Sequence, residues 1–371
     1  MMNSLRSFWR RHKKKIFVTL GVVGSGYAVY KLYDAHKRRL YELETLLARK
    51  RENDERIKAQ MQEHFEGIQR IADSTTLPHA VLILSSRLNE ELDLAVLTER
   101  LKQEKDTLTR PEKLELWDRL KVLSFTKMVL SLWSVTMLSL FVRVQVNILG
   151  RQLYIDIASS RESSPFIEEA NFLDEDDEQK FLTRPDFLAR HGFPTLIADM
   201  EAAATEILKN KQLNYSFDYS TLHETVMQIL DTFMSMEKPQ RWMDCFTLED
   251  AQFSSLIASS SSNNFIQSNA TKFDQLMAEA RTVLSSDEFF NTVNVSLKTM
   301  ANAVMADVFN HPSGAAEPST GIPLVKLVPR VAQVSKQLLD QPSENRFIKL
   351  IRNIQDVELF FTILYTNTST V

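Results

Sequence analysis

The sequence predicts an all-α protein, in which a large helical domain follows an N-terminal tether. Its 371 residues include only 8 glycines and 11 prolines, and Leu, Ala, Glu, Lys and Gln are plentiful. This composition favours helices, because these five residues have high helix propensity and because sheets need many glycine-containing turns. Apolar residues also recur at spacings of three and four, and no alternation of strands and helices is evident.

Charge is distributed unevenly along the chain. Residues 1–39 contain ten Lys and Arg and one acid, a charge of +9, whereas the remaining 34 basic and 47 acidic residues carry −13. An acidic body disfavours nucleic-acid binding, which requires a basic surface, but the basic leader suits anionic lipid headgroups. Cys245 is the only cysteine, so an internal disulfide is impossible and a reducing compartment is expected.

The first 33 residues combine a basic cluster with an apolar run. Ile16–Tyr30 contains 15 uncharged residues, which span about 22 Å as a helix, whereas a bilayer core is about 30 Å thick. Extending the helix to Tyr33 lengthens it to about 27 Å, provided that Lys31 snorkels its amine to the headgroups. A membrane anchor fits this length. From the residues alone, a cleaved secretory signal peptide and a mitochondrial presequence remain alternatives, whereas basic clusters at both ends disfavour a buried helix.

The membrane segment has two sets of predicted contact residues. The headgroup cluster comprises Arg10, Arg11, Lys13, Lys14 and Lys15. The anchor residues are Ile16, Phe17, Val18, Leu20, Val22, Val23, Tyr27, Val29 and Tyr30.

A long charged helix is predicted from Asp34 to about Ser74. Residues 49–56 are almost wholly charged, so the helix should be solvated all round there. Elsewhere its apolar residues recur at helical spacing, which indicates packing along one side. These residues are Leu40, Leu43, Leu47, Ile57, Met61, Phe65 and Ile68.

The next predicted helices lie at 77–105 and after a capping box, Thr109-Arg110-Pro111-Glu112, in which Thr and Glu satisfy the first backbone donors of a helix. The helix that follows the box contains Met128–Val142, 15 residues without a charge. This length is typical of a buried core helix and short for a membrane span. We therefore expect it to be the central helix of a bundle.

Further helices are expected at about 194–210, 219–236, 271–284, 286–310, 324–339 and 343–365. Polar segments separate them. Residues 157–183 are expected to form an acidic loop followed by a short helix, and loops are expected in the Ser/Asn-rich 255–270 region and at 311–323. No role is assigned to the acidic 160–180 loop or to the 255–270 loop.

The sequence contains no recognisable catalytic, cofactor or metal motif. Its seven histidines are isolated from one another, its cysteine has no Cys partner, and phosphate-binding glycine loops and the nucleophile-elbow motif are missing. Missing motifs do not exclude an enzyme of another kind, but they favour a binding or scaffold protein, and we expect neither a cofactor nor a metal.

Trp117 is the strongest candidate for a binding residue. Leu114 lies one turn before it and Lys121 one turn after it. Pattern alone leaves two interpretations, a core tryptophan or a tryptophan at the rim of a hydrophobic groove. The groove is the more specific hypothesis, because recognition of a partner helix uses such an aromatic anchor with leucine walls and a flanking lysine.

Five segments carry a resemblance that runs in the same order along nearly the whole chain. They are RRHKKKIF at 10–17, HFEGIQR at 64–70, KLELWDRLKVLSFTK at 113–127, RVQVNILG at 143–150 and PLVKLVP at 323–329. In these segments the sequence resembles the peroxin-3 family of peroxisomal membrane biogenesis factors. The 113–127 segment is the most specific of the five.

The resemblance implies a large elongated helical bundle with an N-terminal single-pass membrane anchor helix that is not cleaved. Residues 1–33 would form the leader and anchor, 34–74 the charged helix that leaves the membrane, and 75–371 a cytosolic bundle. The location would be the peroxisomal membrane, which is compatible with an endoplasmic-reticulum origin. A tether anchored in a mitochondrial or endoplasmic-reticulum membrane is the alternative.

The resemblance also implies partners. Such proteins are docking receptors for peroxin-19, the soluble chaperone of newly made peroxisomal membrane proteins, and an amphipathic helix of the chaperone lies in an apolar groove. Membrane lipids and other peroxisomal membrane proteins would be further partners, and lysines at the groove rim would steer an acidic partner. The residues placed at this groove are Lys113, Leu114, Trp117, Leu120 and Lys121, with Leu101 and Lys102 nearby and Lys326 at the rim.

Overall fold

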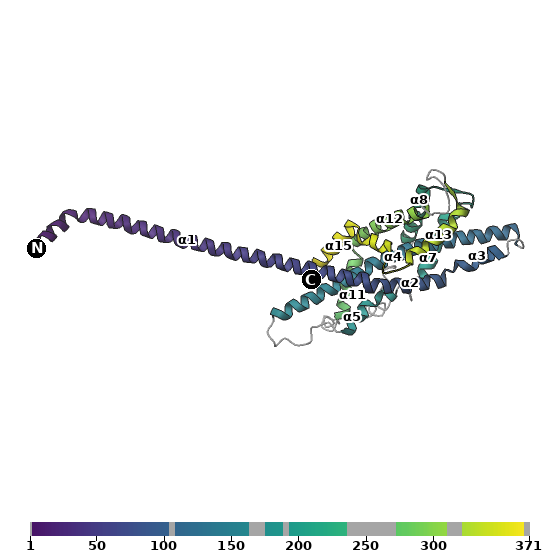
Figure 1. Cartoon of the computed structure of the whole chain (residues 1–371), viewed down its shortest axis with the longest axis horizontal. Helices are drawn as coiled ribbons and strands as arrows, with labels where there is room; N and C mark the ends of the chain where they lie inside the picture. Colours follow the sequence, from purple (N-terminus) through teal and green to yellow (C-terminus); the bar gives the residue numbers. More distant parts are fainter. Residues whose placement is uncertain are drawn as a thin grey trace, which may run out of the picture. The chain divides into compact units, whose positions relative to one another are not determined.

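The computed structural model describes residues 2–103, 108–162, 175–187, 193–235, 272–309 and 321–366. Contacts divide the chain into two units, Met1–His64 and Phe65–Val371. Helices account for nearly all of the described residues, which confirms the predicted all-α class (Figure 1). Among those residues the strands are β1 (Ser216–Phe217) and β2 (Ile322–Pro323), which pair antiparallel.

The first unit consists of most of helix α1 (Met2–Ile71), in agreement with a continuous helix through the predicted charged segment. The expected packing along one side of this helix is wrong for its first part, because Leu40, Leu43 and Leu47 are exposed. Ile68, by contrast, is buried within the second unit. The side chains of residues 2–30 lie outside the described part of the structure, so the predicted anchor and headgroup cluster stay predictions.

The second unit begins with the end of α1, a single π-helical turn η1 (Ala72–Thr76) and α2 (Leu77–Glu91). The region predicted to be helical at 77–105 contains two helices, because α2 ends at Glu91 and α3 (Leu94–Gln103) starts after Leu92 and Asp93. The physical reason is the side chain of Asp93, whose Oδ1 accepts a hydrogen bond of 2.8 Å from the backbone N–H of Ala95. An aspartate in this position favours the start of a new helix.

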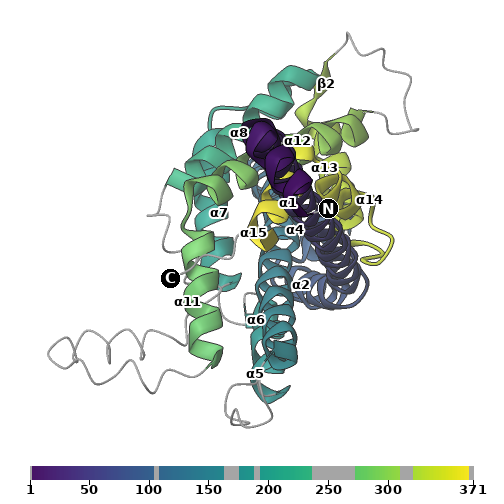
Figure 2. The same cartoon turned by 90° about the vertical axis from the view of Figure 1, so that its left-hand side faces the viewer.

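Helix α4 (Arg110–Glu162) is the centre of the second unit. Residues 128–142 are all buried, which confirms that the uncharged run is a core helix. A stretch within Arg110–Ile155 is the one candidate membrane span found among the described residues, and its apolar window is wholly buried. Helices from both sides of it in the sequence pack against α4, among them α2, α3 and the helices described in the next paragraph (Figure 2). This is expected for a helix with a central stretch that is apolar all round.

The remaining helices agree largely with the sequence pattern. Three lie between α4 and β1, namely α5 (Glu175–Leu182), α6 (Arg184–Phe187) and α7 (Phe193–Leu208). The others are α8 (Tyr219–Ser235), α11 (Lys272–Leu284), α12 (Asp287–Phe309), α13 (Leu324–Leu339), α14 (Arg346–Arg352) and α15 (Gln355–Thr366).

Two expected boundaries are wrong. Helix α4 continues to Glu162, so the acidic loop begins later than expected, and its residues 163–174 lie outside the described part. The helix expected at 343–365 is divided between α14 and α15. Asn345 starts α14 by accepting hydrogen bonds from the N–H groups of Phe347 and Ile348. The expected loops at 255–270 and 311–320 also lie outside the described residues.

Candidate functional site

Helix α3 and the first turns of α4 form a helical hairpin with apolar side chains that the fold does not fully cover. No residue of α3 is buried, although the helix is amphipathic. Leu97 and Leu101 are half-buried, and Val96 is 66% exposed. A helix with such a face is ordinarily packed against a core, so this hairpin offers apolar surface to a partner.

Glu112 makes its part of the predicted capping box at the start of α4. The backbone N–H and the hydroxyl of Thr109 both donate to Glu112 Oε2, at 2.8 and 2.7 Å. These two hydrogen bonds stabilise the carboxylate and lower the pKa of Glu112 below its ordinary value. The box fixes the first turn of α4 and therefore the direction in which the next two turns point.

Trp117 lies two turns into α4 and is half-buried. It is therefore neither a core residue nor fully solvated, and part of its indole ring is accessible. Leu114, one turn before it, is 56% exposed. A partly embedded tryptophan beside an exposed leucine has the character of an interface anchor.

Lys121 does not lie at the surface. Its side chain is 4% exposed, and its amine donates to Asp118 Oδ1 at 3.0 Å, to the carbonyl of Leu208 at 3.3 Å and to the carbonyl of Lys211 at 3.0 Å. The amine thus occupies the C-terminal end of α7, where a cation is favourable. Leu120 is also buried, so the structure places both residues beneath the hairpin surface.

The other predicted groove residues are distributed around the same end of the bundle. Leu101 and Lys113 are half-buried, and Lys102 is exposed. Lys326 is exposed in the first turn of α13, next to Val325, whose N–H donates to the carbonyl of Leu213 at 3.0 Å. Lys326 and Lys121 therefore border the same connecting segment, residues 208–217.

Lys127 of α4 is a second buried lysine, and it contacts the end of α2 at the base of the hairpin. Its amine donates to Asn89 Oδ1 and to the carbonyl of Leu92, both at 2.9 Å. Burial, with a smaller contribution from the charge of Lys336, lowers the pKa of Lys127. Because Leu92 ends α2 immediately before α3, this contact fixes the place from which α3 departs. The sequence pattern assigns Lys127 no role, and its place at the edge of the uncharged run is the one signal that marks it.

An ionic cluster holds the start of the second unit to α4. Arg143 is buried and contacts Asp73 Oδ1 at 2.9 Å, while Arg352 contacts Asp73 Oδ2 at 3.2 Å. Burial lowers the pKa of Arg143, and Asp73 opposes this effect. The cluster ties η1, α4 and α14 together, which is a structural role.

Comparison with known proteins gives a consistent result. The family model described as Peroxin-3 matches residues 104–367. Peroxisome biogenesis protein 3-2 of Arabidopsis thaliana is 50% identical over 366 residues, with 99% of each chain covered. The chain belongs to the peroxin-3 family. Peroxisomal biogenesis factor 3 of Homo sapiens is a more distant relative, 26% identical over 392 residues that cover 100% of this chain and 98% of that protein.

Membership of the peroxin-3 family confirms the resemblance inferred from the five segments. Three of them, including the specific 113–127 segment, lie inside the range of the family model, and the full-length alignment to the plant relative includes the others. The family does not by itself assign individual residues to partner binding. The groove residues therefore remain predictions, which the geometry of the hairpin makes specific.

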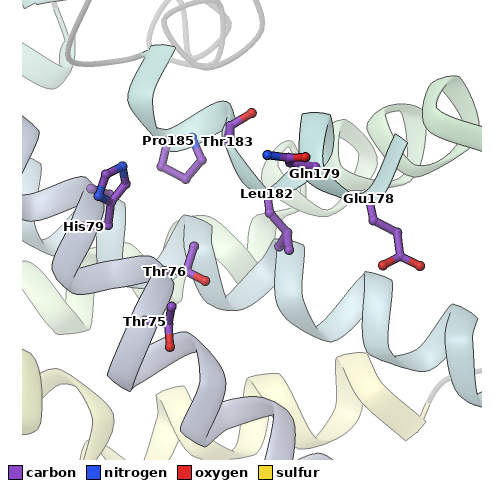
Figure 3. Close-up of a pocket in the computed structure, with 9 residues that line it drawn as sticks. Thr75, Thr76, His79, Glu178, Gln179, Leu182, Thr183 and Pro185 are labelled. Atoms are coloured by element: carbon purple, nitrogen blue, oxygen red, sulfur yellow. The ribbon is translucent and has the colours of Figure 1, made fainter. Parts of the chain in front are cut away.

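The second unit of this peroxin-3 family member also has a surface hollow of about 380 Å³. Thr76 and His79, from η1 and α2, face Leu182 of α5 and Pro185 of α6 across it (Figure 3). Within the described part of the chain no group of three His, Cys, Asp or Glu side chains could hold a metal. The mixed lining does not indicate a particular ligand.

Proposed function

We propose that this chain is a docking receptor of the peroxisomal membrane that binds peroxin-19, the soluble chaperone carrying newly made peroxisomal membrane proteins. A general role in peroxisome biogenesis follows from the family and from the names of its relatives. The finer proposal rests on one observation, the accessible indole of Trp117 on a hairpin whose apolar residues are incompletely covered.

The proposed mechanism is binding without chemistry. An amphipathic helix of the chaperone buries its apolar face against Trp117, Leu114 and Leu101, which are accessible to different degrees. Each Å² of apolar area removed from water contributes about 25 cal/mol before the cost of ordering the helix. The exposed amines of Lys102 and Lys326 would raise the association rate of an acidic partner.

The membrane part of the proposal assigns residues 16–33 to a single-pass anchor and the second unit to the cytosol. The basic residues before the apolar run would bind anionic headgroups. In this arrangement the bundle can receive the chaperone from solution while the chain stays at the membrane where its cargo is inserted.

The test is calorimetric titration of the full chain, held in lipid nanodiscs, with a synthetic peptide from the amino-terminal amphipathic region of peroxin-19. Trp117→Ala should weaken binding by at least about 2 kcal/mol, roughly 30-fold, because a buried aromatic anchor is lost. Leu359→Ala, which truncates an exposed apolar residue of α15, is the matched control and should bind like the unmodified chain.

Two outcomes would contradict the proposal. A folded wild-type chain that does not bind the peptide would refute the docking function. Binding that is unchanged in Trp117→Ala, with an unaltered circular dichroism spectrum, would retain the function but move the site elsewhere.

A further inference from the structure

One face of α4 continues from Trp117 into the connection between α7 and α8. Trp117, Lys121 and Phe125 are spaced four residues apart, so they form one row along the helix. The amine of Lys121 contacts the carbonyls of Leu208 and Lys211, and the ring of Phe125 lies 6.4 Å from that of Phe217. The 208–217 segment therefore follows this row, and Trp117 is only one turn, about 6 Å of rise, beyond Lys121.

The same segment is bonded to the start of α13. The N–H of Leu324 donates to the carbonyl of Tyr215 at 2.8 Å, and β1 pairs with β2 directly afterwards. Gly321 leaves no room for a side chain, because an added Cβ would overlap Ser216 Oγ and lie 3.2 Å from the carbonyl oxygen of Phe217. The 208–217 segment thus joins the two regions that carry Trp117 and Lys326.

Tyr215 is an exposed aromatic residue in this hydrogen-bonded segment. Its side chain is 45% exposed, although its ring packs edge-on against the buried Phe217 at 5.2 Å. The amine of Lys211 lies 5.9 Å from the Tyr215 ring and 5.1 Å from the Phe217 ring. That amine is itself fixed by a hydrogen bond of 2.6 Å to Thr225 Oγ1, so cation–π contacts support the ring from one side.

We infer that the docking surface extends from Trp117 across the 208–217 segment and that Tyr215 is a second aromatic anchor for the same partner helix. The inference rests on the proposed function and deepens it. A tyrosine whose ring is held before binding loses little conformational entropy when a partner covers it, which is why such residues are frequent interface anchors.

Charge at this end of the surface suits a helix with acidic residues. Lys326 is exposed beside the segment. The nearby carboxylate of Asp218 is engaged at the start of α8, where it accepts from the N–H of Thr221 at 2.7 Å, and Glu206 is paired with Lys209 at 2.7 Å. An acidic side chain of the partner, one or two turns from the residue that contacts Trp117, can therefore meet a cation beside Tyr215.

The test uses the full chain in nanodiscs and the peroxin-19 peptide described above. Tyr215→Ala should weaken binding between 5-fold and 30-fold, whereas Tyr215→Phe should stay within about threefold of the unmodified chain because the ring is kept. Tyr219→Ala is the matched control, because Tyr219 is 41% exposed but packs against His223 and Phe309. It should bind normally.

Hydrogen exchange on the unmodified chain provides a measurement that needs no variant. Peptide binding should slow exchange of the 209–217 amides that are open to solvent, together with those near Trp117. Two results would overturn the extension while the proposed function stands. One is slowed exchange near Trp117 with no slowing at 209–217. The other is normal binding by Tyr215→Ala together with weak binding by Trp117→Ala. Equal losses in Tyr215→Ala and Tyr219→Ala would also overturn it, and no binding by the unmodified chain would overturn both.

Discussion

Replacing Lys121 by methionine removes an amine from the interior while keeping the length and apolar stem of the side chain. The carbonyl of Leu208 would keep a partner, because it also accepts from the N–H of Lys211 at 3.0 Å. The carbonyl of Lys211 would lose the 3.0 Å hydrogen bond from the amine. Leaving this partly buried acceptor without its donor costs about 1–2 kcal/mol, the lower part of the range for buried groups, and loss of the cation at the C-terminus of α7 costs up to about 1 kcal/mol more.

The expected decrease in the free energy of unfolding is therefore about 2 kcal/mol, after relief of the desolvation of the ammonium is subtracted. For the second unit, Phe65–Val371, that decrease lowers Tm by about 3 °C, because the entropy of unfolding grows with chain length. The assay is thermal unfolding of the full chain in detergent, followed by circular dichroism. Lys102→Met is the control, because Lys102 is an exposed lysine of the same hairpin and its loss should leave Tm unchanged.

Peptide binding separates the two roles that Lys121 can have. If Lys121 positions the connecting segment, Lys121→Met lowers both Tm and affinity. If it were a rim lysine that contacts the partner, affinity would fall and become less sensitive to salt while Tm stayed at the wild-type value. A wild-type Tm in Lys121→Met would therefore refute the reasoning from its buried contacts.

Two further predictions concern the interior of the second unit. Gly150→Ala should destabilise the chain by about 1 kcal/mol in denaturant titration, because an added Cβ would overlap Ile68 Cδ1. In an Ile68→Ala background the same change should instead stabilise the chain by up to about 1 kcal/mol, because alanine has the higher helix propensity. Destabilisation in both backgrounds would show that Ile68 is not the cause. Burial raises the pKa of Tyr365 to about 12, so the unfolded chain ionises this phenol first, and the free energy of unfolding should fall as pH rises from about 10 to 12. In Tyr365→Phe this part of the pH dependence should be missing when unfolding is measured across that range. An identical pH dependence in both chains would contradict the assignment.

The sequence predicted the helices well where the pattern itself carries the physical cause. Met128–Val142 was assigned to the core because it is uncharged on every side, and the structure buries it. The breaks after α2 and α14 were missed because neither contains glycine or proline. Asp93 produces the break between α2 and α3 through a local side-chain hydrogen bond. The apolar spacing of the sequence continues across this break and does not mark it.

The candidate site was only partly predictable, for a different reason. The spacing of Leu114, Trp117 and Lys121 placed all three on one face of a helix, which the structure confirms in the helical backbone of α4. Their exposure depends on what lies opposite them in the fold. Besides Asp118, the Lys121 amine has two carbonyl partners, which are 87 and 90 residues away in the chain. Helical periodicity contains no information about such contacts, so a buried lysine and a rim lysine give the same pattern.

These long-range contacts explain how an incompletely covered apolar hairpin keeps its position. Lys121 is bonded to backbone carbonyls at the end of α7, and Lys127 to the carbonyl that ends α2. Both lysines project from the part of α4 that follows Trp117, and each satisfies carbonyls that a helix end leaves without intrahelical partners. The hairpin is thus held at its base by directional hydrogen bonds, while its apolar side chains are only partly covered. A surface built in this way is preorganised for a partner helix, because the ordering cost is met largely by the fold before binding.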